Sequence, residues 1–83
     1  MNRDPIAEGI KCIISEKGFI QKAVAKRAGY TSQQFNDMLN NRKTIKAVDI
    51  IPISKALDVS VQDIYNAGSV YLSNDYEKSA LVK

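Results

Sequence analysis

The stretch that most constrains this chain runs from Gln21 to Asn40, with the sequence QKAVAKRAGYTSQQFNDMLN. Small and apolar residues recur at helical spacing on both sides of Gly29. They are Val24, Ala25, Ala28, Phe35, Met38 and Leu39. Gly29 predicts the end of one helix, because glycine adopts the left-handed conformation without a Cβ clash. Thr31 and Gln34 have capping-box spacing and predict the start of a second helix, so the stretch predicts a helix, a tight turn and a helix.

The segment before this stretch predicts one longer helix. Asp4 can provide an N-cap oxygen, and Pro5 suits the first helical position. Gly18 is expected to end this helix after Lys17. The next helix has a poor cap, because Ile20 stands at the cap position and has no oxygen to accept a backbone hydrogen bond.

Two further helices are expected after the stretch. Pro52 would cost about 3 kcal/mol inside a helix, because it removes a backbone donor and clashes with the preceding turn. With Asp49 as the N-cap, Pro52 falls in the first turn, so the fourth helix is expected to run from Ile50 to Leu57. Ser60 caps the fifth helix, with an acid three residues later completing a Ser-x-x-acid box.

Residues 1–68 are expected to form one domain, because Gly68 is predicted to end the fifth helix and the 83 residues suit a single domain. The predicted fold class is therefore all-α, a compact domain of five helices. Residues 69–83 contain apolar side chains, among them Tyr71 and Leu72, without clear periodicity. A flap packed on the domain, a dimer contact and a disordered terminus remain open for this tail.

Charge is distributed unevenly along the chain. Residues 17–46 contain seven basic residues and one acidic residue, a net charge of +6. Residues 47–83 contain three basic and five acidic residues, a net charge of −2. The positive half coincides with the two-helix stretch, as expected for a surface that meets a polyanion. No apolar run reaches the roughly 18 residues of a membrane helix, and the N-terminus lacks a signal-peptide core. A cytoplasmic protein without membrane attachment is expected.

The residue types argue against catalysis and metal binding. The chain has no histidine and a single cysteine, Cys12, so it can form neither an intrachain disulfide nor a zinc site of the usual ligands. Its carboxylates are scattered, which indicates no acid–base pair, and it has no glycine-rich phosphate loop. We therefore expect no enzyme activity, no cofactor and no small-molecule ligand, with Cys12 serving as a small apolar residue of the first helix.

The helix–glycine–helix stretch and the later segment KALDVSVQDIY resemble the lambda-repressor-like, Cro-type helix-turn-helix family, also called XRE. The resemblance covers residues 6–66 and implies a DNA-binding domain whose helix-turn-helix is formed by the second and third helices. Ile14 and Leu39 depart from the pattern, because family members typically carry an arginine and a glutamate that pair at these places. We expect Ile14 and Leu39 to pack against each other, since replacing both charges together is tolerable.

The resemblance gives each matched residue a role in DNA binding. A phosphate contact from the start of the second helix is assigned to Gln21. Base reading is assigned to Ser32, Gln33 and Asp37. Backbone contacts after the recognition helix are assigned to Asn40, Arg42 and Lys43. Ile20 departs here too, because family members often place a polar phosphate-binding group at its position.

Helix geometry adds to these assignments. Gln33 can form hydrogen bonds with both N6 and N7 of adenine. The negative charge of Asp37, in contrast, repels the DNA backbone unless a basic residue pairs with it. Tyr30 lies in the turn, where packing is favoured over a hydroxyl that faces DNA. Three basic residues are assigned to the solvated face of the second helix, with a role in long-range steering: Lys22, Lys26 and Arg27. The predicted DNA-binding set is Gln21, Thr31, Ser32, Gln33, Asn36, Asp37, Asn40, Arg42, Lys43 and Lys46.

These features predict a small transcriptional regulator, expected to be a repressor, that binds double-stranded DNA with residues 31–40 in the major groove. A homodimer on a palindromic operator is expected, because one domain of this size makes few base contacts. The alternative is a protein-interaction module of the antitoxin or anti-repressor-target kind, which Leu39, Asp37 and the apolar tail favour. A nonspecific DNA-coating protein would normally carry more charge than +3.

Overall fold

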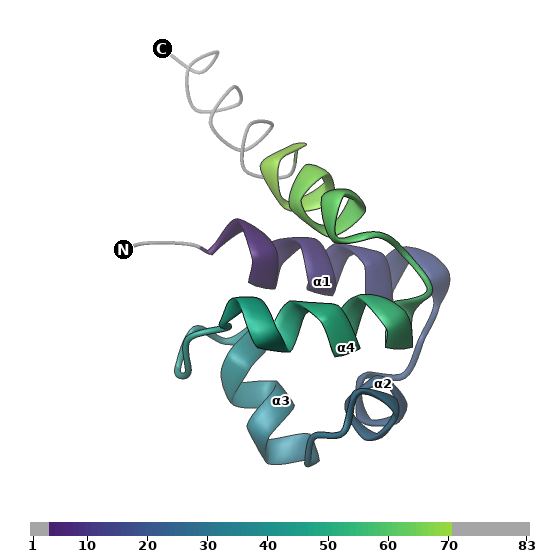
Figure 1. The fold of residues 1–83 in the computed structure, drawn as a ribbon. Coiled ribbons are helices and arrows are strands. Elements are labelled where there is room, and N and C mark those ends of the chain that lie inside the picture. The colour runs from purple at the N-terminus through teal and green to yellow at the C-terminus, as the bar shows by residue number, and fades with distance from the viewer. Residues whose placement is uncertain (1–3, 71–83) are drawn as a thin grey trace, which may run out of the picture.

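The computed structural model describes residues 4–70, which form five helices (Figure 1). They are α1 (Pro5–Lys17), α2 (Gln21–Ala28), α3 (Ser32–Leu39), α4 (Ala47–Leu57) and a fifth helix over residues 61–70. No strand occurs in this part of the chain. The prediction of an all-α, five-helix fold is confirmed.

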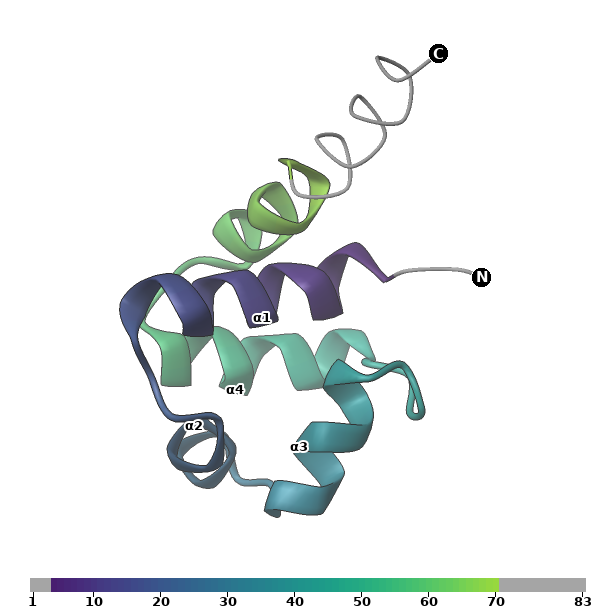
Figure 2. The same ribbon diagram turned by 180° about the vertical axis from the view of Figure 1, so that it is seen from behind.

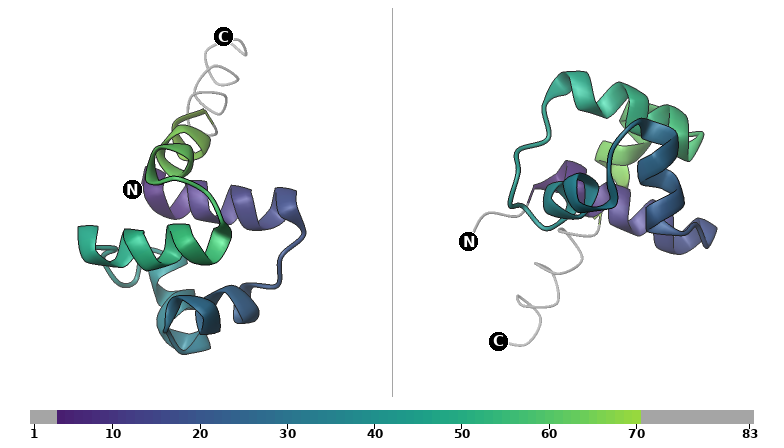
Figure 3. Two further views of the ribbon diagram at one scale, coloured as in Figure 1. Left: turned by 45° about the vertical axis from the view of Figure 1, so that its right-hand side comes forward. Right: turned by 90° about the horizontal axis from the view of Figure 1, so that it is seen from below.

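The helix-turn-helix lies at one end of the molecule. Figures 1 and 2 show α2 and α3 together at that end, the fifth helix at the opposite end, and α1 and α4 between them. The left view of Figure 3 shows the same separation after a further turn of the molecule. The surface of α3 is therefore remote from the fifth helix.

Local signals set the first three helices as predicted. The Asp4 carboxylate accepts a 2.9 Å hydrogen bond from the N–H of Ile6, and Gly18 ends α1 with a φ of 69°. Gly29 ends α2 with a φ of 91°, in the left-handed region that favours glycine. Ile20 makes no side-chain hydrogen bond to cap α2, as expected of an apolar residue.

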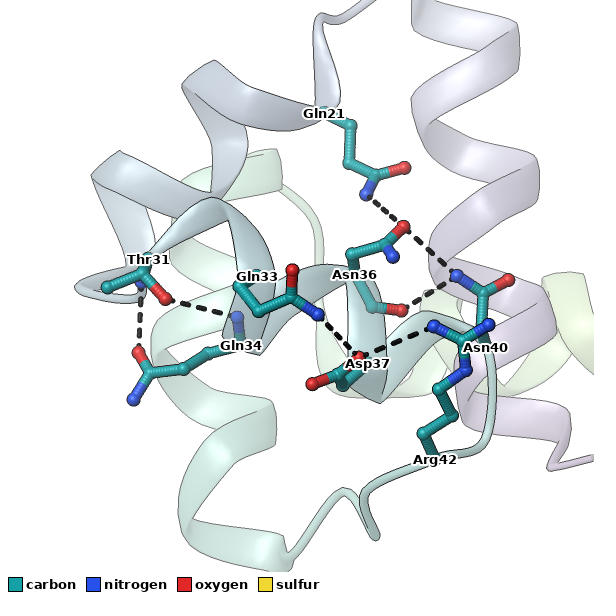
Figure 4. Close-up of polar contacts among 8 residues, drawn as sticks. All are labelled: Gln21, Thr31, Gln33, Gln34, Asn36, Asp37, Asn40 and Arg42. Carbon is teal, nitrogen blue, oxygen red and sulfur yellow. Dashed lines mark hydrogen bonds and ion pairs between the residues drawn. The ribbon is translucent and has the colours of Figure 1, made fainter.

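The capping box of α3 is formed in both directions (Figure 4). The Thr31 hydroxyl accepts a hydrogen bond from the Gln34 N–H at 3.1 Å. The Gln34 side-chain oxygen accepts one from the Thr31 N–H at 2.9 Å. Two of the donors that a helix N-terminus leaves unpaired are thus satisfied within the turn.

The predicted start of α4 is wrong. The helix begins at Ala47, with Lys46 at the N-cap, so Pro52 lies inside the helix rather than in its first turn. Asp49 is not the cap; from the third helical position, its carboxylate accepts a 2.9 Å hydrogen bond from the Lys46 N–H. Pro52 leaves the carbonyl of Val48 without a helical donor, and because Val48 is 74% exposed, solvent can supply one.

The fifth helix begins as predicted and continues beyond its predicted end. The Ser60 hydroxyl accepts from the Asp63 N–H at 3.0 Å, and the Asp63 carboxylate accepts from the Ser60 N–H at 3.1 Å. Gly68 does not end the helix, which continues through residue 70. The tail assigned to residues 69–83 therefore starts inside this helix, and its residues 71–83 lie outside the described part of the chain.

Gly68 serves instead to let the fifth helix cross α1 closely. A Cβ atom at Gly68 would overlap the carbonyl oxygen of Pro5 and lie 3.0 Å from the backbone nitrogen of Gly9. A Cβ atom at Gly9 would in turn overlap the carbonyl oxygen of Ile64. The two helices thus meet backbone to backbone at a pair of glycines.

All five helices contribute to one apolar core. Its buried members are Ile10, Ile13, Val24, Ala25, Phe35, Met38, Leu39, Ile53, Ala56, Leu57 and Ile64. Ala25 of α2 is 1% exposed and belongs to this core. Leu39 belongs to this core and Ile14 packs against it. The two apolar residues that stand where family members carry a charge pair thus both take part in apolar packing. Cys12 is half-buried on α1, outside the core cluster.

Candidate nucleic-acid interface

α3 divides into an apolar face and a polar face. Phe35, Met38 and Leu39 are almost fully buried, because they recur at the spacing that places them on one side of the helix. The exposed residues at its N-terminal end are Thr31, Ser32, Gln33 and Gln34. The predicted recognition helix therefore presents its polar side chains to solvent.

A first hydrogen-bonded row joins α2 to the end of α3 (Figure 4). The Oδ1 atom of Asn36 accepts a long hydrogen bond from Nε2 of Gln21 at 3.4 Å. The same oxygen accepts from Nδ2 of Asn40 at 3.0 Å, and that Nδ2 also donates to the Asn36 carbonyl at 2.8 Å. Asn36 thus links Gln21, at the start of α2, to Asn40, at the end of α3; both are expected to contact phosphate.

A second row joins α3 to the loop that follows it. The Oδ1 atom of Asp37 accepts a 3.0 Å hydrogen bond from Nε2 of Gln33 and lies 3.7 Å from Nη1 of Arg42 (Figure 4). The Asp37 carbonyl also accepts hydrogen bonds from the N–H groups of Arg42 and Lys43, at 2.8 and 3.2 Å. Asp37, the acidic residue on the outward face of α3, is therefore paired with the basic residue Arg42. This pairing makes the negative charge of Asp37 compatible with a nearby phosphate.

A shallow hollow lies between α2 and α3. Its lining includes Gln21 and Lys22 from the first turn of α2, and Ser32, Gln33 and Asn36 from α3. The fold thus places the predicted base-reading residues Ser32 and Gln33 beside the predicted phosphate contact. Sequence reasoning placed Lys22 on a solvated face and omitted it from the site, although its position next to Gln21 was a usable signal.

The loop after α3 is basic and exposed. Asn41 takes a φ of 61°, a conformation that asparagine tolerates better than most residues, and so turns the chain out of α3. Arg42, Lys43 and Lys46 are exposed in this loop. The side chains of Lys43 and Lys46 are not part of either hydrogen-bonded row; both lie near Asp49 and help to lower the pKa of its carboxyl.

Tyr30 is fixed in the turn between α2 and α3. Its ring stacks on Phe35, with the centroids 6.4 Å apart and the planes 14° apart. Its hydroxyl donates a 2.7 Å hydrogen bond to Oδ1 of Asp49 in α4. Burial, followed by the bond to the Asp49 carboxylate, raises the pKa of Tyr30 to about 12. The Tyr30 bond in turn lowers the pKa of Asp49, so the hydroxyl is engaged in packing rather than free for DNA.

Two of the features that favoured a protein-interaction module have local explanations. Leu39 is 1% exposed and belongs to the core, so it is not part of a docking surface. Asp37 is bonded to Gln33 and faces Arg42. The third feature, the apolar tail around Tyr71 and Leu72, falls outside the described residues.

A family model described as the Cro/C1-type HTH DNA-binding domain matches residues 10–67. The chain belongs to this family. The match spans both rows, the hollow and the basic loop, and it confirms the resemblance that the sequence carried. This Cro/C1-type domain is thus a domain for binding double-stranded DNA. Among curated proteins and among solved structures, none matches the chain significantly.

Two further observations concern residues 4–70 alone. None of their helices combines the length and the apolar character needed to cross a bilayer. No group of acidic or cysteine side chains among them is arranged to hold a metal ion.

Proposed function

We propose that this Cro/C1-type domain is a sequence-specific transcriptional regulator that inserts α3 into the major groove. The observation that carries the proposal is the polar, exposed N-terminal half of α3, backed by a buried apolar face and flanked by Gln21 and the basic loop. Side chains at the N-terminal end of a recognition helix can reach base edges in the groove. Catalysis is not part of the proposed role.

The proposed contacts fall into two kinds. Ser32 and Gln33 reach base edges, and Gln33 suits adenine because its amide can both donate and accept. Thr31 and Asn36 border this surface, with their polar atoms engaged in the capping box and in the first row. Contacts with the DNA phosphate backbone fix the position of α3 without reading sequence. They are assigned to Gln21, Asn40, Arg42, Lys43 and Lys46.

We further propose a homodimer that binds a palindromic operator, with half-sites about one helical turn, or roughly 34 Å, apart. A single short helix makes too few base contacts for sequence-specific binding. Two copies of α3 double that number. Repression in the cytoplasm is the proposed outcome, because a bound dimer excludes other proteins from the same duplex.

Selection from a random pool of duplexes at moderate salt, followed by sequencing, tests the proposal. Enrichment of a palindrome is expected. Binding without enrichment would indicate contact with phosphates alone, and absence of binding would favour the protein-interaction alternative. A variant with both Ser32→Ala and Gln33→Ala is the matched control, since it keeps the basic loop and should bind without the wild-type base preference.

A further inference from the structure

Asp37 determines which way the side-chain amide of Gln33 faces. A carboxylate can only accept hydrogen bonds, so the group that Gln33 turns toward Asp37 must be its NH2. The 3.0 Å bond from Nε2 to Oδ1 has this sense, and the Gln33 carbonyl oxygen points away from Asp37 (Figure 4). Without such a partner, an amide can turn over and exchange its donor and acceptor positions.

The fixed amide has one N–H and one carbonyl oxygen left for a ligand. An adenine edge in the major groove offers an acceptor at N7 and a donor at N6, which matches this pair, whereas guanine offers acceptors at both N7 and O6. We infer that Asp37 is a positioning residue that sets the preference of Gln33 for adenine and reads no base of its own. The inference rests on the proposed function and reassigns Asp37 from the base-reading role implied by family resemblance.

Arg42 lies beside the same oxygen of this carboxylate. Its Nη1 lies 3.7 Å from the oxygen that accepts from Gln33, while the Arg42 N–H donates to the Asp37 carbonyl at 2.8 Å. The acid is thus held between two groups of its own chain, with its side chain 30% exposed. A negative charge so paired can stay on a DNA-facing helix because a cation lies beside it.

Selected-pool binding of four variants tests the inference. Gln33→Ala is expected to lower the adenine preference at one operator position, by about fivefold to a hundredfold. Asp37→Ala should lower the preference at that same position and raise the tolerance for guanine there. The double variant should lose no more than Gln33→Ala alone. Asp37→Asn offers a donor as well as an acceptor, so it no longer fixes the orientation of the Gln33 amide and should lower the adenine preference as Asp37→Ala does.

Glu16→Ala is the matched control for charge. Glu16 is exposed on α1, outside the proposed interface, and its removal changes net charge as Asp37→Ala does. Any general gain in affinity for duplex DNA seen with both variants is then a charge effect. A change of base preference should occur with Asp37→Ala alone.

A nuclear magnetic resonance measurement on the free protein separates positioning from general structure. The Gln33 side-chain amide signals are identified by their absence from the Gln33→Ala spectrum. Asp37→Ala should move one of the two amide proton signals strongly, because it removes a charge-assisted hydrogen bond. Glu16→Ala should move neither.

The outcomes distinguish this inference from the proposed function. If the wild-type protein enriches a sequence but Asp37→Ala alters a position other than that of Gln33, Asp37 reads its own base and the inference is overturned. Unchanged amide signals in Asp37→Ala would also overturn it. If the wild-type protein enriches no sequence, the proposed function fails, and the inference fails with it because no base reading remains to be positioned.

Discussion

The hydroxyl of Tyr30 donates a 2.7 Å hydrogen bond to the carboxylate of Asp49, and this bond joins the turn before α3 to the first turn of α4. Asp49 also accepts the Lys46 N–H, so a single carboxylate holds two segments in place. The position of the helix-turn-helix relative to α4 therefore depends on a polar contact as well as on the core.

Tyr30→Phe removes this bond and leaves the ring stacked on Phe35. The free energy of unfolding should fall by about 1–2 kcal/mol, because the lost bond is to a charged acceptor that remains partly open to solvent. Urea denaturation measures the change. Tyr65→Phe, at an exposed tyrosine of the fifth helix, is the matched control and should leave stability unchanged.

The pH dependence of stability should carry the signature of the same pair. The pKa of Tyr30 is raised to about 12, so its contribution is complete below the ordinary tyrosine value and is lost as pH rises from there through the folded value. The pKa of Asp49 is lowered, so its contribution is complete above the ordinary aspartate value and is lost as pH falls through the folded value.

Thermal unfolding across pH, in wild type and Tyr30→Phe, tests both limbs. The difference between the two proteins should shrink at the alkaline end, because Phe has no proton to lose. A constant difference up to the highest pH at which the protein stays folded would contradict the assignment.

Gly9→Ala should destabilise the domain by about 3 kcal/mol or more, since the added methyl group meets backbone rather than a movable side chain. At an ordinary position within a helix, the same change would stabilise by roughly 0.5–1 kcal/mol. The sign of the effect therefore reports the helix crossing. Ser15→Ala, at an exposed site on α1, is the control, and denaturant midpoints give the comparison.

Ile20→Thr should stabilise the protein by about 1 kcal/mol, because a threonine oxygen can cap α2 where no side chain now does. Ile20 is 71% exposed, so its replacement removes little buried surface. Ile20→Val, which keeps the branched shape without the oxygen, is the control. Equal stability of the two variants would show that capping is not limiting at this helix.

Arg42→Ala should weaken binding to all duplexes alike and lower the slope of log affinity against log salt by about one, as expected for the loss of a phosphate contact. Lys55→Ala, at an exposed position near the end of α4, removes a charge of the same sign outside the proposed interface. Titrations at several salt concentrations compare the two. A change in base preference in Arg42→Ala would contradict a purely backbone role.

The elements that were predictable from sequence depend on residues within four positions of one another. The Asp4 cap, the Thr31–Gln34 box and the glycine at the end of α2 are all of this kind. The start of α4 was missed although the bond between Asp49 and the Lys46 N–H is also local, because Pro52 was expected only in the first turn of a helix. Gly68 was misassigned because the reason for a glycine at this position, the close approach of α1, cannot be read from the neighbouring residues in the sequence.

The candidate site divides in the same way. The pairing of Gln33 with Asp37 follows from a spacing of four residues on a helix, so it was accessible to sequence reasoning. The approach of Arg42 to Asp37 was not, because it depends on how the chain turns at Asn41. The roles of these residues on DNA remain predictions that the variants above can test.

The glycine crossing of α1 and the fifth helix has a practical consequence. It fixes the direction in which the fifth helix leaves the domain, at the end opposite α3 (Figure 1). Val70, which is 58% exposed, therefore offers an anchoring point for a dye or a solid support on the side away from the proposed duplex. A protein immobilised there would keep α3 free, so binding kinetics could be recorded without the surface competing for the groove-facing helix.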